Sequence, residues 1–346
     1  MAKIKIGVIG ASGYTGADLV RLAACHPQIE IAVLTANTHA GKAMANVFPH
    51  LSTVKLPGLI KTEDADWSGI EAVFCGLPHA TSQAVIRELP QHLRVIDMSA
   101  DFRLRDPAVY ETWYGGPHQA LTLQAEAVYG LTEHYRAEIR KARLVACPGC
   151  YPTAALMMIL PLAKAGVIDV SDLIIDAKSG VSGAGRSLKQ NLLFCEAGEG
   201  LSPYAIASHR HAPEMEQEIT RAAGKPVIVN FTPHLIPMSR GELCTTYARL
   251  TGGATAADLK QVLSAAYAGE PFVHLAPEGI MPSTQFVRGS NTVMLGVYAD
   301  RIPGRVILIS TLDNLVKGSA GQAIQNFNLM FGLPEDLGLQ QIALFP

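Results

Sequence analysis

The sequence predicts an α/β protein with two domains, the first built on a doubly wound parallel sheet and the second an α+β domain with a mostly antiparallel sheet. Three observations carry this prediction. The chain has 346 residues, enough for about two domains of roughly 100–200 residues each. Short apolar runs alternate with helical patterns up to about residue 150, as in parallel sheets joined by helices. After about residue 170 the strand-like runs are longer and are joined by Gly- and Pro-rich loops, which favours antiparallel pairing.

The first domain begins with a continuous apolar run at 4–10 that ends in glycine, the pattern of a buried parallel strand. A helical pattern follows it over 14–25. Another helix is predicted at about 81–89. Further strands are predicted at 29–34, 72–75, 94–98 and 144–146.

The second domain, whose pattern begins after about residue 170, contains a predicted helix near 256–268. Its strand-like runs are 173–177, 227–234, 243–250, 292–299 and 305–312. A last helix, predicted at about 317–330, has one apolar face: Val316, Ala320, Ala323, Ile324, Phe327 and Phe331. From its periodicity alone, that helix can dock on either domain.

Composition excludes several classes of protein. The chain is 49% hydrophobic and 17% charged, which excludes a disordered chain. A net charge of -2 leaves no global basic field to hold nucleic acid or an anionic membrane. The longest apolar run, 154–163, is shorter than the ~20 residues that a spanning helix needs. We expect a cytoplasmic protein whose six scattered cysteines are mostly reduced.

A glycine-rich loop follows the first predicted strand: Gly10-Ala11-Ser12-Gly13-Tyr14-Thr15-Gly16. Glycines permit a tight turn and let backbone N–H groups approach a pyrophosphate, and the helix N-terminus favours negative charge. The spacing G-x-x-G-x-x-G meets the dinucleotide fingerprint only approximately, and a simple strand–helix turn would look the same. The strand–turn–helix context favours a Rossmann-like nucleotide site.

The end of the second strand indicates which dinucleotide would bind. A carboxylate there would accept a hydrogen bond from an adenine ribose 2′-hydroxyl and favour NAD. This segment instead offers Thr35, Asn37 and Lys42 and no carboxylate. Hydroxyl, amide and ammonium groups suit a 2′-phosphate, so we predict NADP, although an ordinary polar loop has the same composition.

Cys150 lies in Cys147-Pro148-Gly149-Cys150-Tyr151-Pro152, between a short strand and an apolar helix. The free N–H groups and dipole of that helix would stabilise a thiolate, so a lowered pKa and a nucleophilic Cys150 are one interpretation. Two small buried thiols are another, and a thioredoxin-like redox pair is a third. A zinc site is the least supported interpretation, because no second C-x-x-C follows. We predict no metal.

Three further clusters are rich in polar or small residues. His209 and His211 precede Glu214, and a histidine is the natural acid/base partner of a thiol; a metal pair or a polar loop before a helix would look alike. Arg103 and Arg105 follow a predicted strand end, where they can hold a phosphate or carboxylate or simply pair with nearby acids. A second glycine-rich loop, 178–186, can admit a flat ring or a substrate or can be merely flexible.

Taken together, these motifs resemble the N-acetyl-gamma-glutamyl-phosphate reductase family, and the likeness spans nearly the whole chain. Two segments are specific: the Pro148–Thr153 run P-G-C-Y-P-T and the run D-N-L-V-K-G-S-A-G-Q-A that begins at Asp313. Runs at 10–16, 97–103, 178–186, 209–214 and 233–241 fit the family pattern as well. The resemblance implies an NADP-binding domain at 1–148, with 317–346 packing back onto it. It also implies a catalytic, substrate-binding and oligomerisation domain at 149–316.

The resemblance also assigns roles to residues. It implies that Cys150 is the nucleophile and His209 the general acid/base, with His211 less certain and Glu214 in support. For substrate it implies Arg103, Ser182, His211 and Arg240. For the cofactor it adds, to the glycine loop and the second strand end, Cys75, Pro78, Ser179, Gly180, Gly183, Asn314 and Lys317. It gives no role to Cys147.

The implied reaction is the NADPH-dependent reduction of N-acetyl-L-glutamyl 5-phosphate to the 5-semialdehyde, through a thioester on Cys150, in arginine biosynthesis. The implied partners are the small acyl phosphate substrate, inorganic phosphate and further copies of the chain in a dimer or tetramer, with neither nucleic acid nor membrane. Aspartate-semialdehyde dehydrogenase shares this logic and is the first alternative. A non-catalytic dinucleotide-binding protein with an inert cysteine is the second.

Overall fold

The computed structural model describes residues 3–346, which divide into two compact units. The first unit contains the chain up to Pro148 together with Ser319–Gln340, and the second contains Gly149–Gly318 and Gln341–Pro346. Each unit is built on its own seven-stranded sheet. The predicted fold class, a doubly wound parallel sheet followed by a mostly antiparallel α+β unit, is confirmed.

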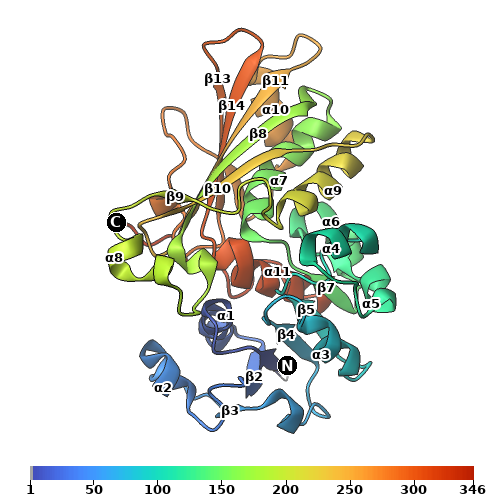
Figure 1. Ribbon diagram of the computed structural model, residues 1–346, viewed down its shortest axis with the longest axis vertical. Coiled ribbons are helices and arrows are strands. Elements are labelled where there is room, and N and C mark those ends of the chain that lie inside the picture. The colour runs from blue at the N-terminus through green and yellow to red at the C-terminus, as the bar shows by residue number, and fades with distance from the viewer. Residues whose placement is uncertain (1–2) are drawn as a thin grey trace. The chain divides into compact units, whose positions relative to one another are not determined.

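The first sheet is entirely parallel and has the order β3-β2-β1-β4-β5-β7-β6 (Figure 1). Its strands are β1 (Ile4–Ile9), β2 (Ile29–Thr35), β3 (Leu59–Ile60), β4 (Ala72–Cys75), β5 (Arg94–Asp97), β6 (Val128–Tyr129) and β7 (Leu144–Ala146). The helices of this unit are α1 (Tyr14–Cys25), α2 (Met44–Val47), α3 (Ser82–Glu88), α4 (Pro107–Tyr114), α5 (Leu121–Glu126), α6 (Thr132–Ile139) and α11 (Gly321–Met330). The strand order reverses direction between β1 and β4, the point at which such sheets bind ligands.

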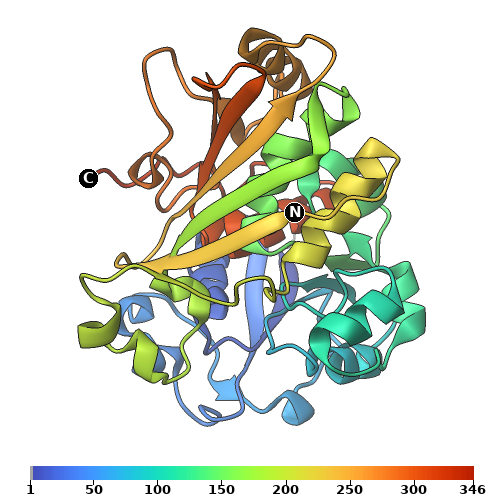
Figure 2. The ribbon, with the colours of Figure 1, turned by 45° about the horizontal axis from the view of Figure 1, so that its top comes forward.

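The second sheet is mixed and mostly antiparallel, with the order β12-β13-β14-β11-β8-β10-β9. Its strands are β8 (Ile168–Gly180), β9 (Ser202–Pro203), β10 (Asn230–Ile236), β11 (Glu242–Leu250), β12 (Val273–Leu275), β13 (Val293–Ala299) and β14 (Arg305–Leu312). Its long strands run side by side in Figure 2. The helices of this unit are α7 (Cys150–Lys164), α8 (Phe194–Ala197), α9 (Ala212–Ala223) and α10 (Ala256–Ala266).

Helix α7 forms the core of the second unit. Its residues from Tyr151 to Ala163 are all buried, and it packs against α9, α10 and strands β8, β11 and β14. Pro161 is accommodated inside it. A helix that is apolar on every side must be covered on every side. Its first residue, Cys150, is therefore held in a fixed place relative to the second sheet.

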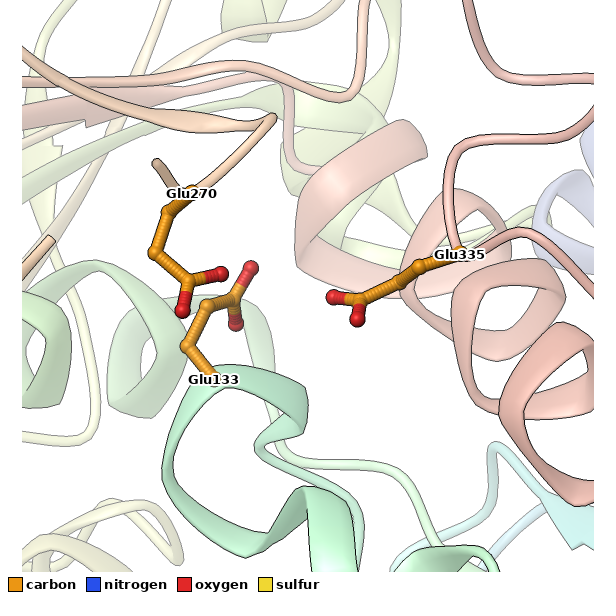
Figure 3. Close-up of side chains that lie close together, drawn as sticks. All are labelled: Glu133, Glu270 and Glu335. Carbon is orange, nitrogen blue, oxygen red and sulfur yellow. The ribbon is translucent and has the colours of Figure 1, made fainter. Parts of the chain in front are cut away.

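Helix α11 lies in the segment Ser319–Gln340 of the first unit, where its side chains form a polar network. Asn326 donates to the Gly130 carbonyl (2.9 Å) and accepts from the Thr132 hydroxyl (2.8 Å). Gln325 donates to Glu133 (3.0 Å) and to Glu335 (2.8 Å), the first from α6 and the second beyond α11; Figure 3 shows both carboxylates. Buried polar groups satisfied in this way fix α11 on α6.

Several element boundaries differ from the predicted ones. Residues 317–318 and 341–346 belong to the second unit instead of returning to the first, where the Leu344 amide donates to the Arg288 carbonyl (2.8 Å). The predicted last helix is divided into a π-helical turn, Val316–Ala320, and α11. Strand β8 begins at Ile168 instead of 173, because Asp169, Ser171 and Asp172 hide its pattern. No helix within residues 3–346 is long and apolar enough to cross a membrane.

Candidate active site

Cys150 is the first residue of α7 and is half-buried. Gly149 precedes it as the N-cap residue in extended conformation, without a side-chain cap. Pro152 has no N–H and the Thr153 amide donates to the Gly149 carbonyl, so the Cys150 and Tyr151 amides are the helix-start N–H groups that can meet an anion beside the thiol. This arrangement places helix N–H groups, which can bind an oxyanion, next to a thiol.

Glu214 fixes the position of the residue before the cysteine. The Gly149 amide donates to Glu214 Oε1 at 2.9 Å. Glu214 lies in the first turn of α9 and is buried. A hydrogen bond to a charged acceptor contributes roughly 1.5–3 kcal/mol, which suffices to hold this turn in one conformation. Glu214 thus positions Cys150 through the backbone.

Both predicted histidines lie beside the same turn. The His211 ring lies against Gly149, so closely that a Cβ on Gly149 would lie 2.3 Å from His211 Nε2. The His209 ring is 4.6 Å from the His211 ring, and its Nδ1 accepts from the His211 amide (3.1 Å). Tyr151 packs edge-on against both rings. The structure therefore brings together Cys150, His209, His211 and Glu214.

The two histidines have different surroundings. Tyr204 and Phe231 also pack edge-on against His209. Burial, with a smaller contribution from the charge of Arg210, lowers the pKa of His209 to about 4. His209 is therefore neutral at neutral pH. Because its Nδ1 accepts a backbone hydrogen bond, the proton lies on Nε2.

The expected lowering of the Cys150 pKa is wrong for this structure. Burial, followed by the negative charge of Glu242, raises the pKa of the thiol well above its usual value. The lowered pKa was predicted from the helix N-terminus alone. Glu242 was not predicted to matter, because it lies 92 residues further along the chain and the sheet brings it to the thiol. One signal in the sequence was available: Glu242 is the single acidic residue in the otherwise uncharged run 241–248.

Three loops of the second unit meet around Asn314. Its side chain accepts from the Gly241 amide (2.8 Å) and donates to the Ser182 hydroxyl (3.0 Å). Gly180 permits this meeting, because a Cβ there would lie 2.8 Å from the Arg240 nitrogen and from the Met238 carbonyl oxygen. The predicted residues of 178–186, together with Arg240 and Asn314, thus form one connected cluster.

Asp313 organises the neighbouring turn. It pairs with Arg240 (3.3 Å) and accepts from the Leu315 amide (2.9 Å). The turn then brings Gly318 against Cys150, because a Cβ on Gly318 would lie 2.7 Å from the Cys150 Cβ. Lys317 is fully buried with its ammonium 5.7 Å from the centre of the Phe272 ring. Sequence reasoning gave no role to Asp313 or Gly318.

Ser179 and Gly183 adjoin this cluster in the second unit. Ser179 is buried, and its hydroxyl donates to the Gly180 carbonyl (3.1 Å). Gly183 is exposed, and a Cβ on it would lie 2.9 Å from the Ser179 hydroxyl. The second glycine-rich loop therefore packs closely because Gly180 and Gly183 have no side chains. Its exposed part is accessible to a ligand.

In the first unit, the glycine loop has the geometry of a phosphate cradle. Gly10 has φ +80, and a Cβ there would lie 2.4 Å from the Gly76 carbonyl oxygen. A Cβ on Gly16 would lie 2.5 Å from the Gly10 carbonyl oxygen. Side chains are thus excluded where the loop enters α1, and Gly13 is the N-cap. The remaining predicted loop residues, Ser12, Tyr14 and Thr15, are half-buried or exposed.

The strand ends beside this loop divide into exposed and buried residues. Asn37, Lys42 and Pro78 are exposed. Thr35 is fully buried and its hydroxyl is 3.0 Å from that of Thr62. Cys75 is also fully buried, in the hydrophobic core. The Thr35 hydroxyl is therefore not available to a 2′-phosphate. The cofactor contact at Cys75 stays a prediction, which its backbone can satisfy.

Arg103 belongs to the first unit and is buried, and its Nη2 donates to the Met98 carbonyl (3.1 Å). It follows β5 at the carboxyl end of the parallel sheet. Asp101 nearby accepts from the Ala80 amide (2.8 Å) and from the Tyr110 hydroxyl (2.9 Å). This network shapes the loops after β4 and β5. The charge-free Gly10 turn and the exposed Lys42 fit a dinucleotide with a 2′-phosphate at the same end of the sheet.

Comparison with known proteins gives the family. Residues 5–142 match the family model described as semialdehyde dehydrogenase, NAD binding domain, and residues 150–314 match semialdehyde dehydrogenase, dimerisation domain. N-acetyl-gamma-glutamyl-phosphate reductase from Rhodospirillum rubrum is 57% identical, with 99% of each chain covered. The chain belongs to the N-acetyl-gamma-glutamyl-phosphate reductase family. The resemblance drawn from the motifs is therefore confirmed.

Other relatives extend this family. The protein of that name from Rhodobacter capsulatus is 55% identical over 99% of each chain. A probable chloroplastic member from Arabidopsis thaliana is 54% identical over 99% of this chain and 86% of its own.

Solved structures with a similar fold are more distant in sequence. Aspartate semialdehyde dehydrogenase II from Vibrio cholerae, complexed with ASA, has a TM-score of 0.71 at 16% identity, with 96% of this chain and 99% of that one covered. The enzyme from Candida albicans with NADP has a TM-score of 0.70 at 17% identity over 95% and 99%. These likenesses concern the fold.

We predict that His209→Asn reduces the loss of stability in acid. The folded-state pKa of about 4 lies below the ordinary histidine value of 6.5, so the unfolded chain takes up the proton more readily. Stability is therefore lost as the pH falls from about 6.5 towards 4, by up to about 3 kcal/mol. Urea unfolding of the wild type and the variant at several pH values across this interval measures the difference. His274→Asn, which changes an exposed histidine, is the control; equal pH dependence in all three proteins contradicts the prediction.

Proposed function

We propose that this chain reduces N-acetyl-L-glutamyl 5-phosphate to N-acetyl-L-glutamate 5-semialdehyde through a thioester on Cys150. One observation carries the proposal: in a member of this family, a cysteine begins a buried helix, and two histidines and a buried carboxylate from another segment lie beside that turn. Relatives of 54–57% identity that span nearly the whole chain support this substrate. The aspartate semialdehyde dehydrogenases are 16–17% identical and support the fold only.

In the proposed acylation, the Cys150 sulfur attacks the acyl carbon and the bond to phosphate oxygen breaks. The free N–H groups at the start of α7 stabilise the oxyanion, an effect of roughly 3–4 kcal/mol for one good donor. Phosphate leaves as its anion with the electron pair of the broken bond, so His211 keeps its proton for the later step. Arg240, half-buried beside this turn, is our candidate for the substrate carboxylate or phosphate, and Arg103 of the first unit is the other.

We assign the acid/base role to His211 in preference to His209, which the sequence favoured. The His211 ring contacts the residue before Cys150, whereas His209 is enclosed by aromatic rings and has a pKa of about 4. His211 protonates the oxygen that forms on the acyl carbon and later removes that proton as the C–S bond breaks. General acid–base catalysis of this kind contributes about 100–10,000-fold.

The proposed cofactor is NADP. The Gly10 turn would receive the pyrophosphate at the start of α1, and Asn37 and Lys42 would receive the 2′-phosphate. When bound, NADPH supplies the hydride that reduces the thioester. Asn314 and the loop of Ser182 and Gly183 are our candidates for contacts to the nicotinamide end.

We propose that copies of this chain associate through the open face of the second sheet. Residues of β8, β11 and β14 alternate between buried positions, on the face that α7 covers, and half-buried positions on the other face. The half-buried positions include Ile174, Tyr247, Ile307 and Ile309. The dimerisation-domain model covers this sheet, which supports a homodimer or a tetramer built from it. A cytoplasmic location remains a prediction.

We predict that Cys150→Ala abolishes the NADP- and phosphate-dependent oxidation of N-acetylglutamate semialdehyde, because the nucleophile is lost. Cys25→Ser changes an exposed thiol and keeps full activity. The wild type is assayed in parallel with aspartate semialdehyde. Near-normal turnover by Cys150→Ala would refute the covalent mechanism, and preference for the aspartyl substrate would overturn the assignment. Failure of both substrates would favour a non-catalytic dinucleotide-binding protein.

We predict that Lys42→Ala raises the KM for NADPH about tenfold and leaves the KM for NADH unchanged. The reason is loss of a charge-assisted bond to the 2′-phosphate, which contributes roughly 1.5–3 kcal/mol. Steady-state kinetics with both cofactors measure the effect. Lys141→Ala removes another exposed lysine of the same unit and serves as the control. An equal change in both KM values would show that Lys42 does not bind the 2′-phosphate.

A further inference from the structure

Glu242 is a fully buried carboxyl group beside the candidate nucleophile. It is the first residue of β11, a strand in which Glu242, Cys244, Thr246 and Ala248 are buried and the residues between them are not. Because side chains alternate along a strand, these four point to one face. That face packs on α7, whose first residue is Cys150.

Neither carboxyl oxygen of Glu242 has a well-formed hydrogen bond within the described chain. The polar group that faces it is the Cys150 thiol, and each group affects the pKa of the other. Gly318 lies between them, because a Cβ on it would lie 2.7 Å from the Cys150 Cβ and 3.2 Å from Leu312, the register partner of Glu242. A buried carboxyl without other partners is costly to a fold, so its retention beside a nucleophile points to chemistry.

We propose that Glu242 is the base that activates Cys150, a role that rests on the proposed function of Cys150 as nucleophile. The S–H bond breaks, the proton moves to a carboxylate oxygen of Glu242, and the electron pair remains on sulfur as the thiolate. When the C–S bond breaks at the end of the cycle, the departing thiolate takes this proton back. His211 handles the protons on the substrate oxygens, so the two bases have separate tasks.

The electrostatic surroundings set the pH at which this base works. Burial, with a further contribution from the charge of Asp313, raises the pKa of Glu242 to about 8. The titratable groups that interact with its carboxyl are Cys150 and Tyr151 of α7, Cys244 of β11, Tyr204 and Asp313. The carboxyl therefore becomes a proton acceptor as the pH rises through about 8. Burial keeps the thiol from ionising directly into solvent at that pH.

The test is the rate at which iodoacetamide alkylates Cys150 as a function of pH, because this reaction needs neither substrate nor cofactor. We expect the wild-type alkylation rate to rise with pH, with a midpoint near pH 8. At pH 8 the Glu242→Gln rate should be at least about tenfold lower than that of the wild type, and its pH profile should lack that midpoint. A carboxylate that only repels the thiolate predicts the reverse, because its removal lowers the thiol pKa and makes alkylation faster. A faster Glu242→Gln variant therefore overturns the proposal.

The matched control is Glu218→Gln, which alters another fully buried glutamate of the same unit, on α9. We expect its alkylation profile to equal that of the wild type. Glu242→Asp keeps a carboxylate and should recover part of the rate together with an inflection in the pH profile. Loss of the midpoint in Glu218→Gln as well, or no difference between Glu242→Asp and Glu242→Gln, would contradict the role of a specific base.

The wild type alone also tests this role of Glu242, so the test does not depend on a variant that folds. Infrared titration should show the band of a protonated carboxyl that disappears as the pH passes about 8, in parallel with the rise in alkylation. Alkylation that instead follows a midpoint far above this carboxyl titration overturns the proposal. Inactive Cys150→Ala together with a faster Glu242→Gln would refute this role alone and leave the proposed function intact.

Discussion

The hydrogen bond from the Gly149 amide to Glu214 is the contact on which the site depends. It lies where the chain leaves the parallel sheet of the first unit and enters α7 of the second. The bond fixes the turn, the turn fixes the start of α7, and the buried body of that helix fixes both against the second sheet. His211 packs on the same Gly149. This one residue without a side chain donates to the carboxylate, leaves room for the imidazole and precedes the residue that carries the thiol.

This geometry creates a conflict that the proposed mechanism must resolve. The free N–H groups of α7 favour an anion, while burial and Glu242 oppose a thiolate. In the proposed mechanism, the N–H groups of α7 stabilise the oxyanion of the reacting acyl group. In the resting protein, burial and Glu242 keep the thiol protonated. A thiol that stays protonated until a local base accepts its proton is protected from oxidation and from stray electrophiles. Cys147, buried with a pKa raised to about 12 by burial, is inert for the same reason.

The sequence could predict what depends on local patterns. Apolar runs and helical periodicity gave the parallel sheet, and the glycine loop and the Pro-Gly-Cys turn marked two functional positions, because each needs only a few neighbouring residues. Glu242 escaped prediction because its importance depends on strand pairing with Ser179 and Leu312 and on the face turned to α7. The burial of the Thr35 and Cys75 side chains also escaped prediction, since strand ends that look suitable for ligands turn these side chains inward. Local pattern does not determine which side of a strand faces solvent.

The central claim is that Cys150 carries the acyl group during the reaction. Mass spectrometry of the wild-type chain, quenched soon after mixing with N-acetylglutamyl phosphate in the absence of NADPH, tests it most directly. The account predicts phosphate release in proportion to enzyme and an N-acetylglutamyl group on the peptide that contains Cys150. An unmodified Cys150 in enzyme that turns over normally once NADPH is added would contradict it.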